Sequence, residues 1–150
     1  MSRCPDCGAA CQPGEPDCTE RFHTLLALDH SRKEPWGPRH ALAVAAYSLQ
    51  HPSAWPREVL ERSWLILYQV LVRGADSLRV TTALRRRPDT LLEEWETPPL
   101  APGPATRSFA MTIRDLGTFP APEYPTQLDA WCRAAFTGWG GRPRDRSDGD

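Results

Sequence analysis

Lysine is almost absent from this sequence. Lys33 is the one lysine in 150 residues, beside 17 arginines, and the 18 basic and 19 acidic residues leave a formal net charge of −1. A strong field of one sign, which would attract nucleic acid or an anionic membrane, is therefore missing too, and we expect neither as a partner. The densest basic run, Arg85 to Arg87, is interpreted as a solvated helix end whose cations offset the helix dipole, with a phosphate or partner contact as the alternative.

Long hydrophobic runs are also missing. The longest, Trp64 to Val72, is interrupted by Gln69 and falls far short of the roughly 18–20 residues of a membrane span. The first residues lead directly into cysteines without the apolar segment of a secretory signal. We therefore expect a cytoplasmic protein without a membrane segment. In that compartment cysteines stay reduced, so a cluster of them indicates metal binding before disulfides.

The common nucleotide and hydrolase motifs do not occur: the sequence contains no GxGxxG, P-loop, GxSxG or HExxH pattern. No nucleotide site is indicated, and no reaction can be named from a motif. Whether the protein is an enzyme stays open at this stage.

Apolar residues recur at helical spacing over most of the chain, and 40% of the residues are hydrophobic, as in globular proteins. Pro52 and Gly74 mark two helix ends. We predict a mainly α fold, a small bundle of about five helices in a single domain, because 150 residues suit one core. The expected helices cover residues 18–30, 40–51, 56–73, 76–87 and 125–139, with a short one over 90–95.

The remaining segments lack helical periodicity. Residues 1–17 hold three cysteines, two glycines and three prolines, and need something other than an apolar core to order them. Residues 96–107 are a proline-rich connector, and 108–116 fits either a strand or a short helix. We divide the chain into a Cys-rich metal-binding arm (1–17) packed on a helical domain (18–139), followed by a tail (140–150) that is disordered by composition.

The strongest local motif is Cys4-Pro5-Asp6-Cys7-Gly8. Two cysteines separated by two residues and followed by glycine form a tight turn whose backbone amides stabilise thiolates. Zinc needs four ligands in a tetrahedron, so this pair is half a site, and Cys11 and Cys18 are the nearest candidates for the rest. The alternatives are a surface pair without metal and, less favoured, a redox pair, which would follow a strand and open a helix.

Helix geometry places His40 and His51 too far apart to bind the same metal. His40 and His51 lie within about 20° of one helix face but about 16 Å apart along the axis, so one metal cannot bind both. If the first two helices pair antiparallel, Cys18 comes near His51, and Asp29 and His30 come near His40. The sequence thus predicts two polar clusters, one at each end of a helical hairpin.

At the first end, Cys4, Cys7, Cys18 and His51 would complete a closed Cys3His site, the usual form of structural zinc. The alternative for His51 is a residue placed at a helix C-terminus by the dipole.

At the other end, Asp29, His30 and His40 would bind a second metal or act as a base with its orienting carboxylate. The alternative is a hydrogen-bonded structural pair. His23, on the same helix, is expected at the surface.

Two further side chains bear on these sites. Tyr47 lies one helical turn before His51 and two turns after His40, so it can donate a supporting hydrogen bond at either end. Cys132 follows Trp131 in the last helix, and we interpret it as a small core residue.

The motif CPDCG, a later cysteine opening a helix, and the segment HALAVAAYSLQHP together resemble a widespread bacterial family of small proteins of unknown function. The resemblance covers about the first 60 residues and implies a metal-binding helical protein without a known activity. Family members often carry Asp where this chain has Ala45, and Cys11 looks peculiar to this chain, which favours His51 over Cys11 as a ligand. The matching residues are Cys4, Cys7, Cys18, Asp29, His40, Tyr47, Gln50, His51 and Pro52.

We therefore predict a zinc-binding helical protein with a structural Cys3His site and an accessory or partner-binding role. Its partner, a protein or a small molecule, is unknown. The alternative is a small metal-dependent enzyme that uses Asp29, His30 and His40.

Overall fold

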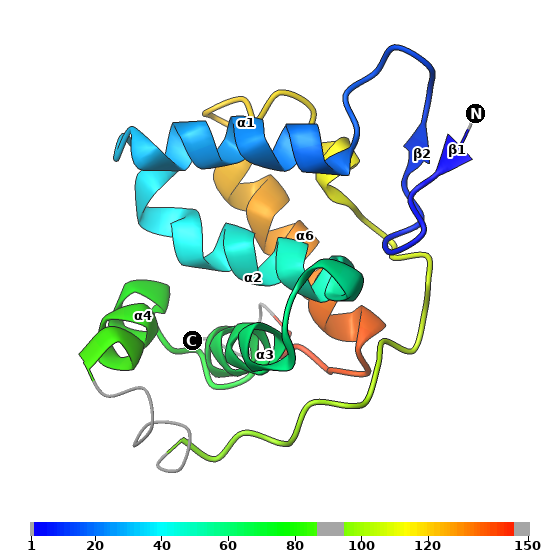
Figure 1. Cartoon of the computed structure of the whole chain (residues 1–150). Helices are drawn as coiled ribbons and strands as arrows, with labels where there is room; N and C mark the ends of the chain where they lie inside the picture. Colours follow the sequence, from blue (N-terminus) through cyan, green and yellow to red (C-terminus); the bar gives the residue numbers. More distant parts are fainter. Residues whose placement is uncertain (1, 87–94, 146–150) are drawn as a thin grey trace.

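The computed structural model of the chain describes residues 2–86 and 95–145 (Figure 1). Within these residues the chain forms five α-helices and one small two-stranded sheet, so the predicted mainly α bundle is confirmed. The short helix expected over 90–95 lies outside the described residues except for its last position. The helices are α1 (Cys18–His30), α2 (His40–Gln50), α3 (Arg57–Leu71), α4 (Ser77–Arg86) and α6 (Tyr124–Gly138).

The helix ends follow local chemistry. The side chain of Asp17 accepts a hydrogen bond from the Glu20 amide at 2.8 Å and caps the start of α1. A 3-10 turn, η1 (Gly37–Arg39), leads into α2 with Pro38 in its first turn. Pro52 opens the next 3-10 turn, η2 (Pro52–Ala54), directly after α2. These breaks fix the lengths of α1 and α2 and allow the chain to reverse between them.

Helix α2 is the centre of the bundle. Helix α1 runs in the opposite direction along one side of it, while α3 and α6 pack on its other sides (Figure 1). The small residues Ala43, Ala45 and Ala46 are at most 1% exposed, and such side chains let neighbouring helices approach closely. Polar side chains gather at the C-terminal end of α2, where Ser48, Gln50 and His51 are buried. The C-terminal end of α2 therefore places polar side chains in the interior of the protein.

Buried tryptophans tie α6 to α2. The indole Nε1 of Trp131 donates to Gln50 Oε1 at 2.9 Å, and Gln50 Nε2 donates to the Met111 carbonyl at 2.7 Å. Trp139 Nε1 donates to the Leu49 carbonyl at 2.6 Å. These bonds satisfy polar groups that would otherwise be costly to bury. They also hold the end of α2, which leads to His51, in one position.

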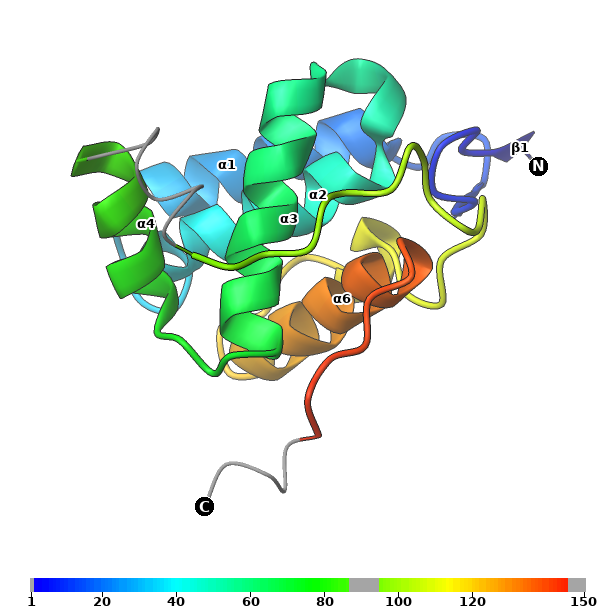
Figure 2. The ribbon, with the colours of Figure 1, turned by 90° about the horizontal axis from the view of Figure 1, so that it is seen from below.

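The proline-rich connector crosses α3 as an extended strap (Figure 2). Side chains of α3 donate to it: Trp64 Nε1 to the Pro98 carbonyl at 2.8 Å and Arg57 to the Leu100 carbonyl at 2.7 Å. Beyond the strap, the segment that fits either a strand or a short helix contains a 3-10 turn, η3 (Ile113–Leu116), whose Ile113 and Leu116 are fully buried.

The described segments before α1 and after α6 are not helical. Near the N-terminus, β1 (Ser2–Arg3) and β2 (Ala10–Cys11) form an antiparallel ladder. Beyond α6, residues 141–145 have no regular structure, but the Arg144 amide donates to the Leu71 carbonyl at 2.8 Å. Among residues 2–86 and 95–145, no helix is long and apolar enough to cross a membrane.

Candidate metal centre

The CPDCG segment folds into a tight turn inside the β1–β2 hairpin. The Cys4 amide donates to the Ala9 carbonyl at 2.8 Å, and the Gly8 amide donates to the Cys4 carbonyl at 2.9 Å. Gly8 has φ +83, and a Cβ there would lie 2.8 Å from the Arg107 carbonyl oxygen. Both the left-handed backbone and the close approach of the neighbouring segment require glycine at this position. The turn thereby rests against the strap that leads to η3.

The structure brings Cys4, Cys7, Cys18 and His51 together, with their ligand atoms within 4.8 Å of one another. Cys4 is half-buried and the other three are buried. The Sγ atoms of Cys7 and Cys18 are 3.7 Å apart. Tetrahedral zinc with Zn–S bonds of about 2.3 Å separates two sulfurs by about 3.8 Å, so the spacing matches that geometry. These four residues can hold one metal ion.

His51 presents the correct ring nitrogen to the thiols. Its Nδ1 lies 2.9 Å from the Tyr47 carbonyl, and because a carbonyl only accepts, Nδ1 carries the hydrogen. In the neutral imidazole, Nε2 is then the nitrogen with a free lone pair. It is buried and has no hydrogen-bond partner. A metal-ligating histidine commonly donates its other ring N–H to a carbonyl, which is the arrangement found here.

The three thiols have different affinities for a proton. The hydrogen bond from Cys18 is the main cause that lowers the pKa of Cys7 to about 4, and His51 and the Ala9 amide act in the same direction. The pKa of Cys18 is raised, first by that hydrogen bond to Cys7 and then by burial. Burial also raises the pKa of Cys4, although the amides of Cys7 and Asp6 oppose this effect. The cluster can thus hold one thiolate readily, whereas further thiolates need a cation for compensation.

Tyr47 supports the cluster differently from the expected side-chain donor. Its ring stacks between Phe22 and His51, with centroid distances of 3.8 Å and 4.0 Å. Its backbone carbonyl, and not its hydroxyl, binds the imidazole. Burial raises the pKa of Tyr47 to about 12, so the ring stays neutral. Tyr47 therefore fixes the orientation of His51 through packing and one backbone contact.

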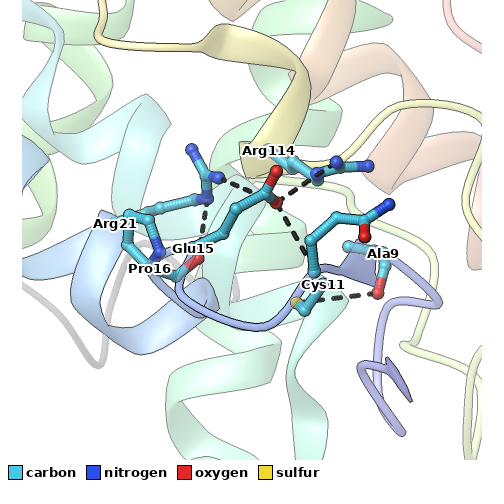
Figure 3. A network of polar contacts seen from close by, with 7 residues as sticks. Ala9, Cys11, Glu15, Pro16, Arg21 and Arg114 are labelled. Atoms are coloured by element: carbon cyan, nitrogen blue, oxygen red, sulfur yellow. Dashed lines mark hydrogen bonds and ion pairs between the residues drawn. The ribbon is translucent and has the colours of Figure 1, made fainter. Parts of the chain in front are cut away.

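The other two cysteines are not part of this group of four, although Cys11 lines the same hollow as Cys4, Cys18 and His51. Cys11 is half-buried in β2, and its Sγ contacts the Ala9 carbonyl at 3.9 Å (Figure 3). Cys132 is buried in α6 beside the Leu42 carbonyl, and burial raises the pKa of its thiol. Cys132 lies in the hydrophobic core, as a small core residue would.

The model of a family of unknown function, DUF5946, matches residues 2–140. The chain belongs to DUF5946. The match includes the arm and the helices together, and the resemblance to a family of unknown function is confirmed. No curated protein and no solved structure matches the chain.

The other end of the α1–α2 hairpin in this DUF5946 chain carries a second polar pair. Asp29 Oδ2 lies 2.8 Å from His40 Nδ1, and the Asp29 side chain is 1% exposed while that of His40 is 39% exposed. The His30 ring centroid is 5.9 Å from that of His40. Within residues 2–86 and 95–145, the group of three or more possible metal ligands that lie close together consists of Cys4, Cys7, Cys18 and His51. It does not include Asp29, His30 or His40. Catalysis or metal binding at Asp29, His30 and His40 stays a prediction.

Sequence reasoning missed Glu15, which ties the arm both to the adjoining helix α1 and to the distant turn η3. Figure 3 shows its carboxylate between two guanidinium groups, 3.2 Å from Arg114 and 3.9 Å from Arg21. Glu15 and Arg114 are 99 residues apart, and no local pattern indicates such a pairing. His23, by contrast, is exposed on α1, as expected.

Proposed function

We propose that Cys4, Cys7, Cys18 and His51 bind one zinc ion that holds the N-terminal arm on the helical bundle. The observation that carries this proposal is the buried Nε2 of His51, which has no hydrogen-bond partner and belongs to a group of ligand atoms with three thiols. Thiolate and imidazole ligands in a tetrahedral arrangement favour zinc over harder divalent ions. A hollow of about 360 Å³ lined in part by Cys4 and Cys18 gives a metal an entry path from the surface.

The expected free energies favour a bound metal over ion pairs as the main source of order in the arm. The Glu15 ion pairs are partly exposed to solvent, with side-chain exposures of 14% for Arg21, 35% for Arg114 and 36% for Glu15. Pairs of this kind contribute about 0–1 kcal/mol each. A structural zinc in a small module supplies about 10–16 kcal/mol. Zinc binding would therefore dominate the folding of residues 1–17.

A set of four protein ligands leaves no coordination position for substrate, which supports a structural role. The protein would then act as an accessory or partner-binding scaffold in a reducing compartment such as the cytoplasm, where the thiols stay available to metal.

We expect about one zinc per chain in protein purified without chelator, measured by elemental analysis. The Cys11→Ser variant is the matched control, because Cys11 lies in the same arm outside the ligand set, and it should keep its zinc. Protein that carries no transition metal would contradict the proposal. So would a Cys4→Ser, Cys7→Ser double variant that keeps its zinc.

We also expect the Cys4→Ser, Cys7→Ser double variant to lose order in residues 1–17 while keeping most of its helical circular dichroism signal. Among residues 2–17, Cys7 and Ala9 are the buried ones, so this part of the arm has almost no apolar core of its own. Limited proteolysis followed by mass spectrometry should find cleavage within the arm at least about ten-fold faster than in Cys11→Ser. Equal protease resistance of the two variants would refute the role of the metal.

The alternative function is a small metal-dependent enzyme that uses Asp29, His30 and His40. The contact that favours it is the 2.8 Å bond between the buried Asp29 carboxylate and His40, which would orient the ring for proton transfer or metal binding. The same elemental analysis distinguishes the two functions. About two metal ions per chain, falling to one in His40→Ala, would support the enzyme.

A further inference from the structure

A second hollow lies between α2, α3 and α4, away from the cysteine cluster. It has a volume of about 260 Å³, and its walls are largely apolar. It exists because α2 presents the small residues Ala41 and Ala45, one turn apart, toward α3 and α4, and these side chains are too short to fill the space. Further apolar lining comes from Val44, Val59, Ile66 and Leu84.

The charged side chains that line this hollow are cationic or can become so. They are Arg62 of α3, Arg85 of α4 and His40 of α2, and no acidic side chain is among the lining residues. Within the described part of the chain, neither Arg62 nor Arg85 forms an ion pair or a side-chain hydrogen bond. Arg57, on the same helix as Arg62, by contrast pairs with Glu61 at 3.5 Å. The two guanidinium groups at the hollow are therefore available to an external anion.

The hydroxyl groups in the lining are already used as donors. Ser63 donates to the Val59 carbonyl at 2.8 Å, and Thr81 donates to the Ser77 carbonyl at 2.9 Å. His40 Nδ1 lies 2.8 Å from Asp29 Oδ2, so this contact orients the ring of His40 where it lines the hollow. A ligand here would meet apolar walls, two guanidinium groups that pair with no acidic side chain of the described residues, and one oriented imidazole.

From this arrangement we infer that the hollow binds a small organic anion, a monocarboxylic acid with a compact apolar body of about the size of benzoate. The carboxylate contacts Arg62 and Arg85, which match it in charge and in donor geometry. The apolar body lies against the aliphatic walls. The volume of about 260 Å³ lies just below the roughly 300–1,000 Å³ of drug-sized ligand sites, which limits the ligand to a small molecule. This inference is independent of the zinc proposal.

The test is a titration of the full chain, as purified, with sodium benzoate at constant ionic strength, followed by backbone and methyl chemical shifts. We expect saturable shifts confined to residues around the hollow, with a Kd of about 1 mM or lower. Benzamide has the same shape without the charge and should bind at least about ten-fold more weakly. Zinc content measured on the same samples keeps this result separate from the metal proposal.

Three substitutions test which arginines bind the carboxylate of benzoate. Arg62→Gln and Arg85→Gln should each weaken benzoate binding about ten-fold, because each removes one charge-assisted contact. Arg79→Gln is the matched control, since Arg79 is exposed on α4 and does not line the hollow, and it should change the Kd less than about two-fold. The inference is overturned if benzoate gives no saturable shifts, if benzamide binds equally well, or if Arg79→Gln weakens binding as much as the other two.

Discussion

Replacing His51 with alanine is expected to weaken zinc binding at least about 100-fold, whereas replacing His40 with alanine should leave the zinc affinity within about two-fold. Loss of a group that merely orients a zinc ligand commonly costs about 10–100-fold in affinity, so loss of a ligand itself should cost at least as much. The two histidines are about 16 Å apart along α2, far beyond the roughly 2.0–2.3 Å bonds of zinc. Competition with a chromogenic chelator measures both affinities.

His23→Ala completes this comparison, because His23 is exposed on α1 and lies outside both clusters. It should behave like the unmodified chain. A strong loss of zinc affinity in His40→Ala, with His51→Ala unaffected, would show that the ligand set is wrong.

The second large effect is a loss of stability when Gln50 is replaced with alanine. Its side chain is fully buried and joins the Trp131 indole to the Met111 carbonyl. Gln50→Ala therefore leaves the buried indole N–H and the part-buried carbonyl without their partner and creates a cavity. A buried unpaired group costs about 1–3 kcal/mol, and the cavity adds to that. We expect a loss of about 3 kcal/mol in the free energy of unfolding, measured by urea denaturation at a fixed, saturating zinc concentration.

Gln69→Ala is the matched control for this substitution. Gln69 is 7% exposed and makes one side-chain hydrogen bond, at 3.0 Å, to Thr97 of the strap. Its replacement should cost only about 1 kcal/mol. If Gln50→Ala destabilises the chain no more than Gln69→Ala does, Gln50 does not link α6 to α2 in solution.

The helices were predictable because their signals are local. Apolar residues at helical spacing and the breaks at Pro52 and Gly74 place α1 to α3 and α6 within one or two residues of the expected ranges. The juxtaposition of Cys18 with His51 also follows from the sequence, once two helices joined by a short connection are paired antiparallel.

Other features have no local signal. The strands β1 and β2 have two residues each, too few for an alternating pattern. The bond between Gln50 and Trp131 joins residues 81 positions apart, and the hollow beside Arg62 depends on how three helices pack. The sequence of segment 108–116 fits both a strand and a short helix, because four residues of 3-10 helix have no distinctive period and the conformation is fixed by the core that Ile113 and Leu116 enter.

The position of the four proposed ligands along the chain bears on how the protein is made. All four lie between Cys4 and His51, ahead of α3 and α6 in the order of synthesis. At about 5–20 residues per second, several seconds separate the emergence of His51 from that of the last helix. Binding of a metal during that interval would hold α1 and α2 as an antiparallel pair before α6 packs on α2. Trp131 and Trp139 would then dock onto a surface that is already formed, which shortens the time that the alanine-rich helix is exposed to aggregation on the ribosome.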